Sequence, residues 1–203
     1  MMQRESLSPK AMKSMPRARE YALLAVLLAH PPDAGMVRRL CGLTGDGTPL
    51  GAAHAALADA AGRARPKDIE REHFDLFIGI GRGELLPYGS YYLTGFLHER
   101  PLARLRASLA CLGIERAPDR AEPEDHAATL CEIMAGLASR ELPEPAGAER
   151  EFFEQHLSPW IGRFFADLER AKAADFYRAV GALGRIFMAI EAEAFALPGR
   201  SAE

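Results

Sequence analysis

One short acidic cluster is the densest group of chemically capable side chains in this chain of 203 residues. Its residues are, in order, Glu122, Pro123, Glu124, Asp125 and His126. Carboxylates beside a histidine can bind a metal ion or perform general acid–base catalysis. Consecutive residues of a helix do not face one another, so a helical cluster could not bring all its groups to one ligand. The competing structural interpretation is a helix start, with Pro123 at the first helical position and carboxylates near the positive end of the helix dipole.

The usual sequence motifs of enzymes are missing elsewhere in the chain. There is no phosphate-loop lysine motif, no zinc-protease motif and no serine-nucleophile motif. The glycine-rich stretch 79–83 is expected to follow a helix and not a strand, which is typical of a helix end and a loop. His156 and Trp160 are four residues apart, but a single histidine beside aromatic residues is more typical of a core. Outside the Glu122–His126 cluster we therefore predict no catalytic residues, no metal and no cofactor.

Helical periodicity dominates the elements that must position these residues. Tyr21, Leu24, Ala25 and Leu28 show the i, i+3, i+4, i+7 spacing of one helical face. Asp33 and Thr48–Pro49 are typical helix starts. We expect helices at residues 21–29, 33–41, 49–61, 66–80, 101–112, 127–137, 152–157, 160–168 and 176–190, and no strands.

The predicted fold class is all-α, a single bundle of about eight to ten helices. Residues 17–197 would form the helical domain, with a flexible N-terminal tail at 1–16 and a short tail at 198–203. The polar connection 114–122 is hinge-like and could support domain swapping, so the chain would be a monomer or a domain-swapped dimer.

Composition excludes several classes of protein. The 25 basic and 28 acidic residues leave a net charge of -3, which argues against nucleic-acid binding. The three cysteines are widely spaced, so we expect neither disulfides nor a thiolate zinc site, and a reducing cytoplasm fits best. The apolar run 21–29 follows basic residues as in a signal peptide, but Glu20 adjoins it and no cleavage site follows. No run reaches the ~18 apolar residues of a membrane span, so no integral membrane contact is predicted.

Five segments, taken in order, resemble motifs of the TorD/DmsD family of molybdoenzyme maturation chaperones. They are Phe74–Gly79, Leu86–Ser90, Glu122–His126, His156–Trp160 and Phe176–Ala179. The Glu122–His126 segment matches the family's Glu-Pro-x-Asp-His motif, and Tyr21 and Leu24 followed by Pro31 and Pro32 resemble its first helix. The resemblance covers about residues 17–195.

The resemblance implies an all-helical cytoplasmic chaperone without enzymatic activity or cofactor. Members of the family bind the apo form of a molybdenum-cofactor oxidoreductase, often through its twin-arginine signal peptide, and assist cofactor insertion before export. The implied partners are the apoenzyme catalytic subunit, its signal peptide and molybdenum-cofactor delivery proteins.

The resemblance also gives candidate client-binding residues. Glu122 and Asp125 are the expected arginine acceptors, because carboxylate and guanidinium form planar bidentate pairs. His126 would orient a carboxylate or make binding pH-sensitive, and Pro123 belongs to the same motif. The expected walls of an apolar groove are Pro87, Tyr88, Tyr21, Leu76 and Phe77.

Other interpretations stay open at this point. Asp75, Leu86 and Gly89 depart from the family pattern, which keeps a chaperone for the mature region of a non-exported molybdoenzyme as an alternative. A small metal-dependent hydrolase using Glu122–His126 is another. A helical interaction module, such as the ligand domain of a transcriptional regulator, is a third, although no basic DNA-reading helix is evident.

Overall fold

The computed structural model describes residues 9–115, 122–139, 145 and 147–197. Within them the chain forms ten α-helices and two short π-helical segments. The α-helices are α1 (Pro9–Ala29), α2 (Ala34–Leu40), α3 (Pro49–Arg63), α4 (Pro66–His73), α5 (Gly89–Thr94), α6 (Arg100–Cys111), α7 (Ala127–Ser139), α8 (Ala148–Phe152), α9 (Ile161–Arg170) and α10 (Phe176–Ala196). The π-helical segments are η1 (Phe74–Ile78) and η2 (Phe153–Leu157). No strand occurs in these ranges, which confirms the all-α prediction.

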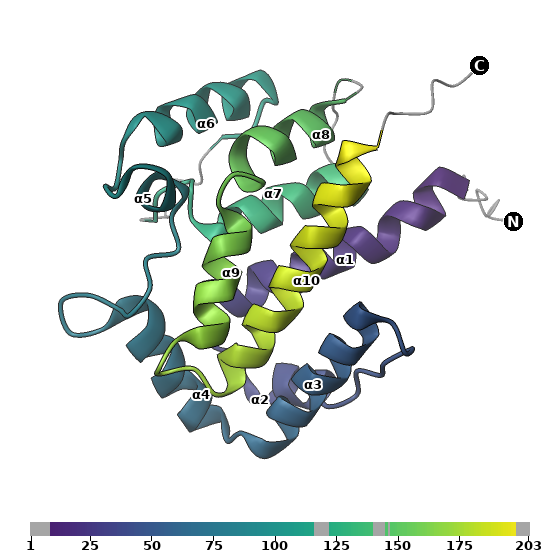
Figure 1. The fold of residues 1–203 in the computed structure, drawn as a ribbon, viewed down its shortest axis with the longest axis vertical. Coiled ribbons are helices and arrows are strands. Elements are labelled where there is room, and N and C mark those ends of the chain that lie inside the picture. The colour runs from purple at the N-terminus through teal and green to yellow at the C-terminus, as the bar shows by residue number, and fades with distance from the viewer. Residues whose placement is uncertain (1–8, 116–121, 140–144, 146, 198–203) are drawn as a thin grey trace, which may run out of the picture.

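The two longest helices organise the bundle (Figure 1). α1 packs along α7, while α10 lies beside α9 and also packs on α3. α2, α3 and α4 gather at one end of the molecule, and α5 and α6 lie toward the other end.

Local sequence signals explain where several helices begin. Asp33 Oδ1 accepts the N–H of Met36 at 2.7 Å, and Thr48 Oγ1 accepts the N–H of Gly51 at 3.0 Å. Both contacts satisfy backbone donors that a helix leaves unpaired in its first turn. The predicted starts of α2 and α3 are therefore confirmed.

The core is aromatic where α9 meets α10. Phe164 and Phe165 of α9 are fully buried, as is Phe176 at the start of α10. A Cβ on Gly184 would lie 2.3 Å from the Phe165 ring, so only glycine allows α10 this close to α9. Each buried large apolar side chain contributes roughly 1.5–3 kcal/mol.

The predicted helix over 66–80 divides into two parts. α4 ends at His73, and the chain continues as the π-helical η1 to Ile78. Gly79 then reverses the chain at a φ of 63°, where an L side chain is strained. The turn is tight, because a Cβ on Gly83 would lie 2.6 Å from the carbonyl oxygen of Leu76.

The ends of the predicted domain are described only in part. α1 begins at Pro9, inside the stretch predicted as a tail, and α10 ends at Ala196. Residues 1–8, 198–203 and most of the hinge-like connection 114–122 lie outside the described residues. No helix in the described part of the chain combines the length and the apolarity that crossing a membrane requires.

Candidate functional site

Three of the five motifs meet at one cavity of about 540 Å³. Gly89 comes from the 86–90 motif, Asp125 from the 122–126 motif, and His156 and Trp160 from the 156–160 motif. α5 and α6 contribute further lining residues: Leu93, Thr94, Pro101, Arg104 and Leu105. The volume lies in the range of ligand pockets, which is about 300–1,000 Å³.

The 122–126 motif precedes α7 instead of forming its first turn. It pairs with the 86–90 motif through an isolated antiparallel bridge between Tyr88 and His126. Gly89 N–H donates to the Asp125 carbonyl at 2.9 Å, and Ala127 N–H donates to the Pro87 carbonyl at 2.8 Å. The motif caps two helices: His126 accepts the N–H of Ala128 in the first turn of α7, and Asp125 caps α5, which the local sequence did not suggest.

Asp125 caps α5 with one of its two carboxylate oxygens. Its Oδ2 accepts the N–H of Ser90 at 2.7 Å, near the start of that helix. Its Oδ1 is buried and has no hydrogen-bond partner, and the side chain is only 3% exposed. An unsatisfied buried acceptor is rare and costs about 1–3 kcal/mol. Because Asp125 also lines the cavity, a ligand that brings an N–H donor could satisfy this oxygen.

Glu122 and His126 are engaged with Tyr88. Glu122 Oε2 accepts a short hydrogen bond from the Tyr88 hydroxyl. Burial and this hydrogen bond raise the pKa of Tyr88. The His126 ring stands edge-on to the Tyr88 ring at 5.2 Å, and its Nδ1 accepts the backbone N–H two residues further on at 3.1 Å. These side chains hold the two motifs together.

Glu124 binds within the protein as well. The guanidinium of Arg106 on α6 contacts both of its carboxylate oxygens, at 3.1 and 2.9 Å. The acidic side chains of the motif therefore diverge from one another. Among the described residues, no group of three or more His, Cys, Asp or Glu side chains is placed to hold a metal ion.

The opposite wall of the cavity is built by η2 and the turn into α9. His156 is 8% exposed, and its Nε2 lies 2.9 Å from Ser108 Oγ on α6. Burial and the nearby charge of Arg104 lower the pKa of His156. Trp160 Nε1 donates to the His156 carbonyl at 2.7 Å, and a Cβ on Gly89 would lie 3.0 Å from Trp160 Nε1. This close approach explains the glycine in the 86–90 motif.

The predicted walls of the groove differ in burial and in the contacts that they make. Pro87 is buried beside the cavity motifs and Tyr88 is half-buried there, while Phe77 packs on Tyr177 with ring centroids 5.5 Å apart. Tyr21 and Leu76 are fully buried. Their apolar helix faces turn inward to the core, and their role as walls of a client groove stays a prediction.

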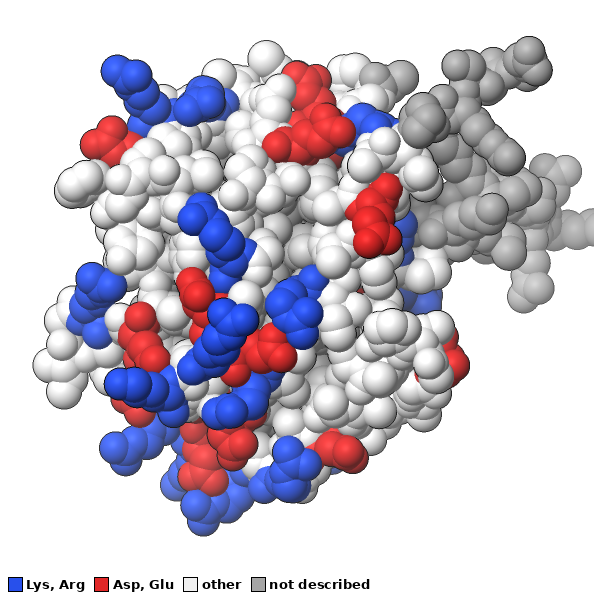
Figure 2. All heavy atoms as spheres, viewed as in Figure 1, with Lys and Arg blue, Asp and Glu red and all other residues white. Residues whose placement is uncertain are grey.

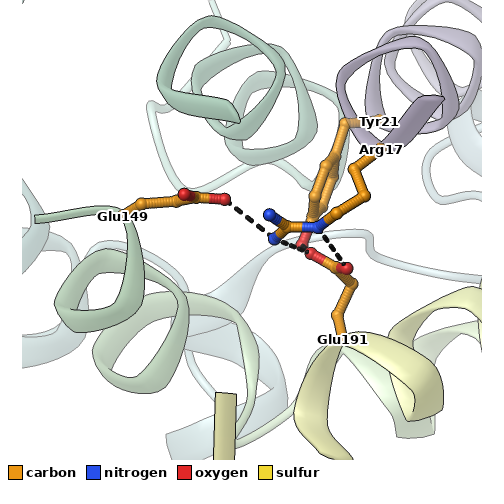
Figure 3. A network of polar contacts seen from close by, with 4 residues as sticks. All are labelled: Arg17, Tyr21, Glu149 and Glu191. Atoms are coloured by element: carbon orange, nitrogen blue, oxygen red, sulfur yellow. Dashed lines mark hydrogen bonds and ion pairs between the residues drawn. The ribbon is translucent and has the colours of Figure 1, made fainter. Parts of the chain in front are cut away.

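Tyr21 has a partner inside the bundle, as Figure 3 shows. Its hydroxyl donates to Glu191 Oε2 on α10 at 2.9 Å, and Arg17 binds the same carboxylate. Tyr21 therefore joins α1 to α10 and is not available at the surface.

Sequence reasoning missed an apolar surface next to the cavity. Leu93 on α5 is 40% exposed, and Phe96 and Leu97 in the following loop are 69% and 38% exposed. Figure 2 shows a largely uncharged area over α5, whereas charges of both signs gather over α4 and the connection between α9 and α10. The sequence could have indicated this surface, because the end of α5 and the loop after it are unusually apolar. The run is Tyr91-Tyr92-Leu93-Thr94-Gly95-Phe96-Leu97.

Comparisons with known proteins identify relatives of the chain. The family model described as nitrate reductase delta subunit matches residues 44–166. The chaperone protein TorD of Vibrio cholerae is 29% identical over 130 residues, which are 60% of this chain and 59% of that protein. TorD of Vibrio atlanticus is 26% identical over 164 residues, covering 73% of this chain and 76% of that protein.

A solved structure shares the fold. A crystal structure assigned as a redox enzyme maturation protein from Archaeoglobus fulgidus superposes with a TM-score of 0.57 at 17% identity, covering 93% of this chain and 98% of that one. The curated relatives are named chaperones, not enzymes. The chain belongs to the family described as nitrate reductase delta subunit, and the resemblance of its motifs to those of TorD-type maturation chaperones is confirmed.

Proposed function

We propose that this protein is a cytoplasmic chaperone that binds an apo molybdenum-cofactor oxidoreductase through its twin-arginine signal peptide and assists cofactor insertion before export. The family and the chaperones named among its relatives support the general role. Molybdenum-cofactor delivery proteins would be further partners. The geometry of the cavity supports the binding of a signal peptide.

The observation that carries the proposal is the unpartnered oxygen of Asp125. Oδ1 is buried and Asp125 lines the cavity, so an entering guanidinium would find an acceptor that no protein donor satisfies. Arginine presents several N–H donors in a planar fork that fits a carboxylate. A hydrogen bond to a charged group in such a shielded position contributes about 1.5–3 kcal/mol.

The apolar part of a signal peptide would lie on the surface formed by Leu93, Phe96 and Leu97. The loop that presents this surface is held in place, because Thr94 Oγ1 donates to the Ser90 carbonyl at 2.9 Å and accepts the Phe96 N–H at 3.2 Å. A preorganised apolar surface loses little conformational entropy when a helical peptide binds to it.

Isothermal titration calorimetry with Asp125→Asn tests the proposal. The asparagine oxygen can keep the Ser90 N–H cap, while an amide NH₂ replaces the unpartnered oxygen and the charge is lost. We expect the fold to persist and the affinity for a twin-arginine peptide to fall about 10- to 100-fold. The same peptide with both arginines replaced by alanine should bind weakly to the wild-type protein.

Asp68→Asn is a matched control. Asp68 lies on α4, where it pairs with Arg65 at an exposed position outside the cavity. This variant should bind the peptide like the wild type. If Asp125→Asn bound the peptide equally well and kept its helicity and melting temperature, the role of Asp125 would be refuted. Binding to an apoenzyme that lacks its signal sequence, with no binding to any signal peptide, would support the mature-region alternative instead.

A further inference from the structure

Two groups of opposite charge line the cavity. One is the carboxylate of Asp125, whose Oδ1 has no hydrogen-bond partner among the described residues. The other is the guanidinium of Arg104, which lines the same cavity from α6 and is exposed. Within the described part of the chain, Arg104 forms no hydrogen bond and no ion pair. Its neighbour on the same helix, Arg106, is held by Glu124.

The other polar groups of the cavity leave this charge pattern unchanged. Burial and the Arg104 charge keep the pKa of His156 below its usual range, so its ring is neutral near pH 7. Gln155 is uncharged, and Glu151, which also acts on His156, is exposed outside the cavity. The cavity therefore presents one negative site at its buried side and one positive site at its exposed side.

We propose that Arg104 is a specificity-determining residue of this site, which takes a client segment with one arginine at Asp125 and an acidic side chain at Arg104. This inference rests on the proposed function, because it concerns the same cavity. A second basic side chain inside the cavity would face Arg104, and like charges brought together in an interface weaken binding. Only one arginine of a twin-arginine pair would therefore enter the cavity, and the other would remain outside it.

Charge reversal at Arg104 tests this inference. One probe is a synthetic peptide with two adjacent arginines followed by a leucine-rich stretch. The second probe is the same peptide with a glutamate placed one or two residues before the arginines. We expect the wild-type protein to bind the glutamate peptide about three- to fivefold more tightly at low salt, as for a partly exposed ion pair. Arg104→Glu should reverse the order, and Arg104→Gln should make the two affinities nearly equal.

Two further measurements make the test specific. Arg100→Glu changes the net charge equally on the same helix, but Arg100 does not line the cavity, so this variant should keep the wild-type preference. Replacing each peptide arginine singly by alanine should weaken binding strongly at one position and little at the other. Because Arg104 is exposed, its variants should keep the helicity and melting temperature of the wild type.

The outcomes separate the two proposals. If Arg104→Glu kept the wild-type order of the two peptides, Arg104 would not determine specificity, even though loss of binding in Asp125→Asn would still support the signal-peptide site. Equal losses at both peptide arginines would also contradict entry of a single arginine. If neither peptide bound the wild-type protein, both proposals would fail.

Discussion

The ion network between α1 and α10 should respond very differently to the loss of each partner (Figure 3). Arg17 Nε and Nη2 bind the two oxygens of Glu191 at 2.7 and 2.5 Å, and the Tyr21 hydroxyl donates to the same carboxylate at 2.9 Å. Arg17 also reaches Glu149 of α8 at 2.8 Å. The Glu191 side chain is 1% exposed, whereas that of Arg17 is 31% exposed.

This difference in exposure sets the expected free energies of unfolding. Arg17→Ala leaves a buried carboxylate with Tyr21 as its remaining donor, and an uncompensated buried charge costs about 3–5 kcal/mol. Glu191→Ala leaves a guanidinium that keeps Glu149 and reaches water, so the main cost is the orphaned Tyr21 hydroxyl, about 1–3 kcal/mol. Arg17→Ala should therefore be the more destabilising variant by about 2 kcal/mol.

Urea denaturation monitored by circular dichroism measures both variants. Equal deficits for the two variants, or a loss below about 1 kcal/mol in Arg17→Ala, would refute the reasoning from burial.

Three other predictions concern the cavity and the core. Gly89→Ala should lower the free energy of unfolding by about 1–3 kcal/mol, because the alanine Cβ would lie 3.0 Å from Trp160. Thermal melting measures this loss. An unchanged melting temperature would mean that α5 can shift freely. Because the pKa of His156 is lowered in the folded state, the folded protein binds a proton at this ring more weakly than the unfolded chain does. The free energy of unfolding should therefore be full above about pH 6.5 and decline below it, and the decline should be less steep in His156→Gln. Identical pH profiles for the two proteins would contradict this prediction. Burial raises the pKa of Cys131 to about 12, so iodoacetamide should label the two exposed cysteines in the native protein and Cys131 only after denaturation, as mass spectrometry would show.

Helices with strong local signals were predictable from the sequence. Asp33 and Thr48 begin α2 and α3 because their side chains accept first-turn N–H groups, an interaction that needs no distant partner. The spacing of Phe176, Val180, Leu183 and Phe187 likewise fits α10, whose buried face these residues form. Such signals are contained in a few neighbouring residues.

Features that depend on distant contacts were not predictable in the same way. α5 lacks a side-chain cap of its own, and the carboxylate that satisfies it comes from Asp125, 35 residues further along the chain. The acidic residues around Pro123 carry a local signal for a helix start, but the backbone there pairs with the 86–90 motif instead. The π-helical turns η1 and η2 have no signal in apolar periodicity, because one extra residue per turn changes the spacing only locally.

The structural and binding roles of the 122–126 motif depend on the same contacts. Glu122 bonds to Tyr88, Glu124 to Arg106, and Asp125 uses Oδ2 to cap α5. These bonds fix the position of Asp125 within the pairing of two motifs, so the residue lines the cavity while its Oδ1 has no hydrogen-bond partner. A carboxylate held in this way needs no rearrangement to accept a donor, which favours binding. Substitutions that loosen the pairing should therefore reduce client affinity even where they leave the charge of Asp125 intact.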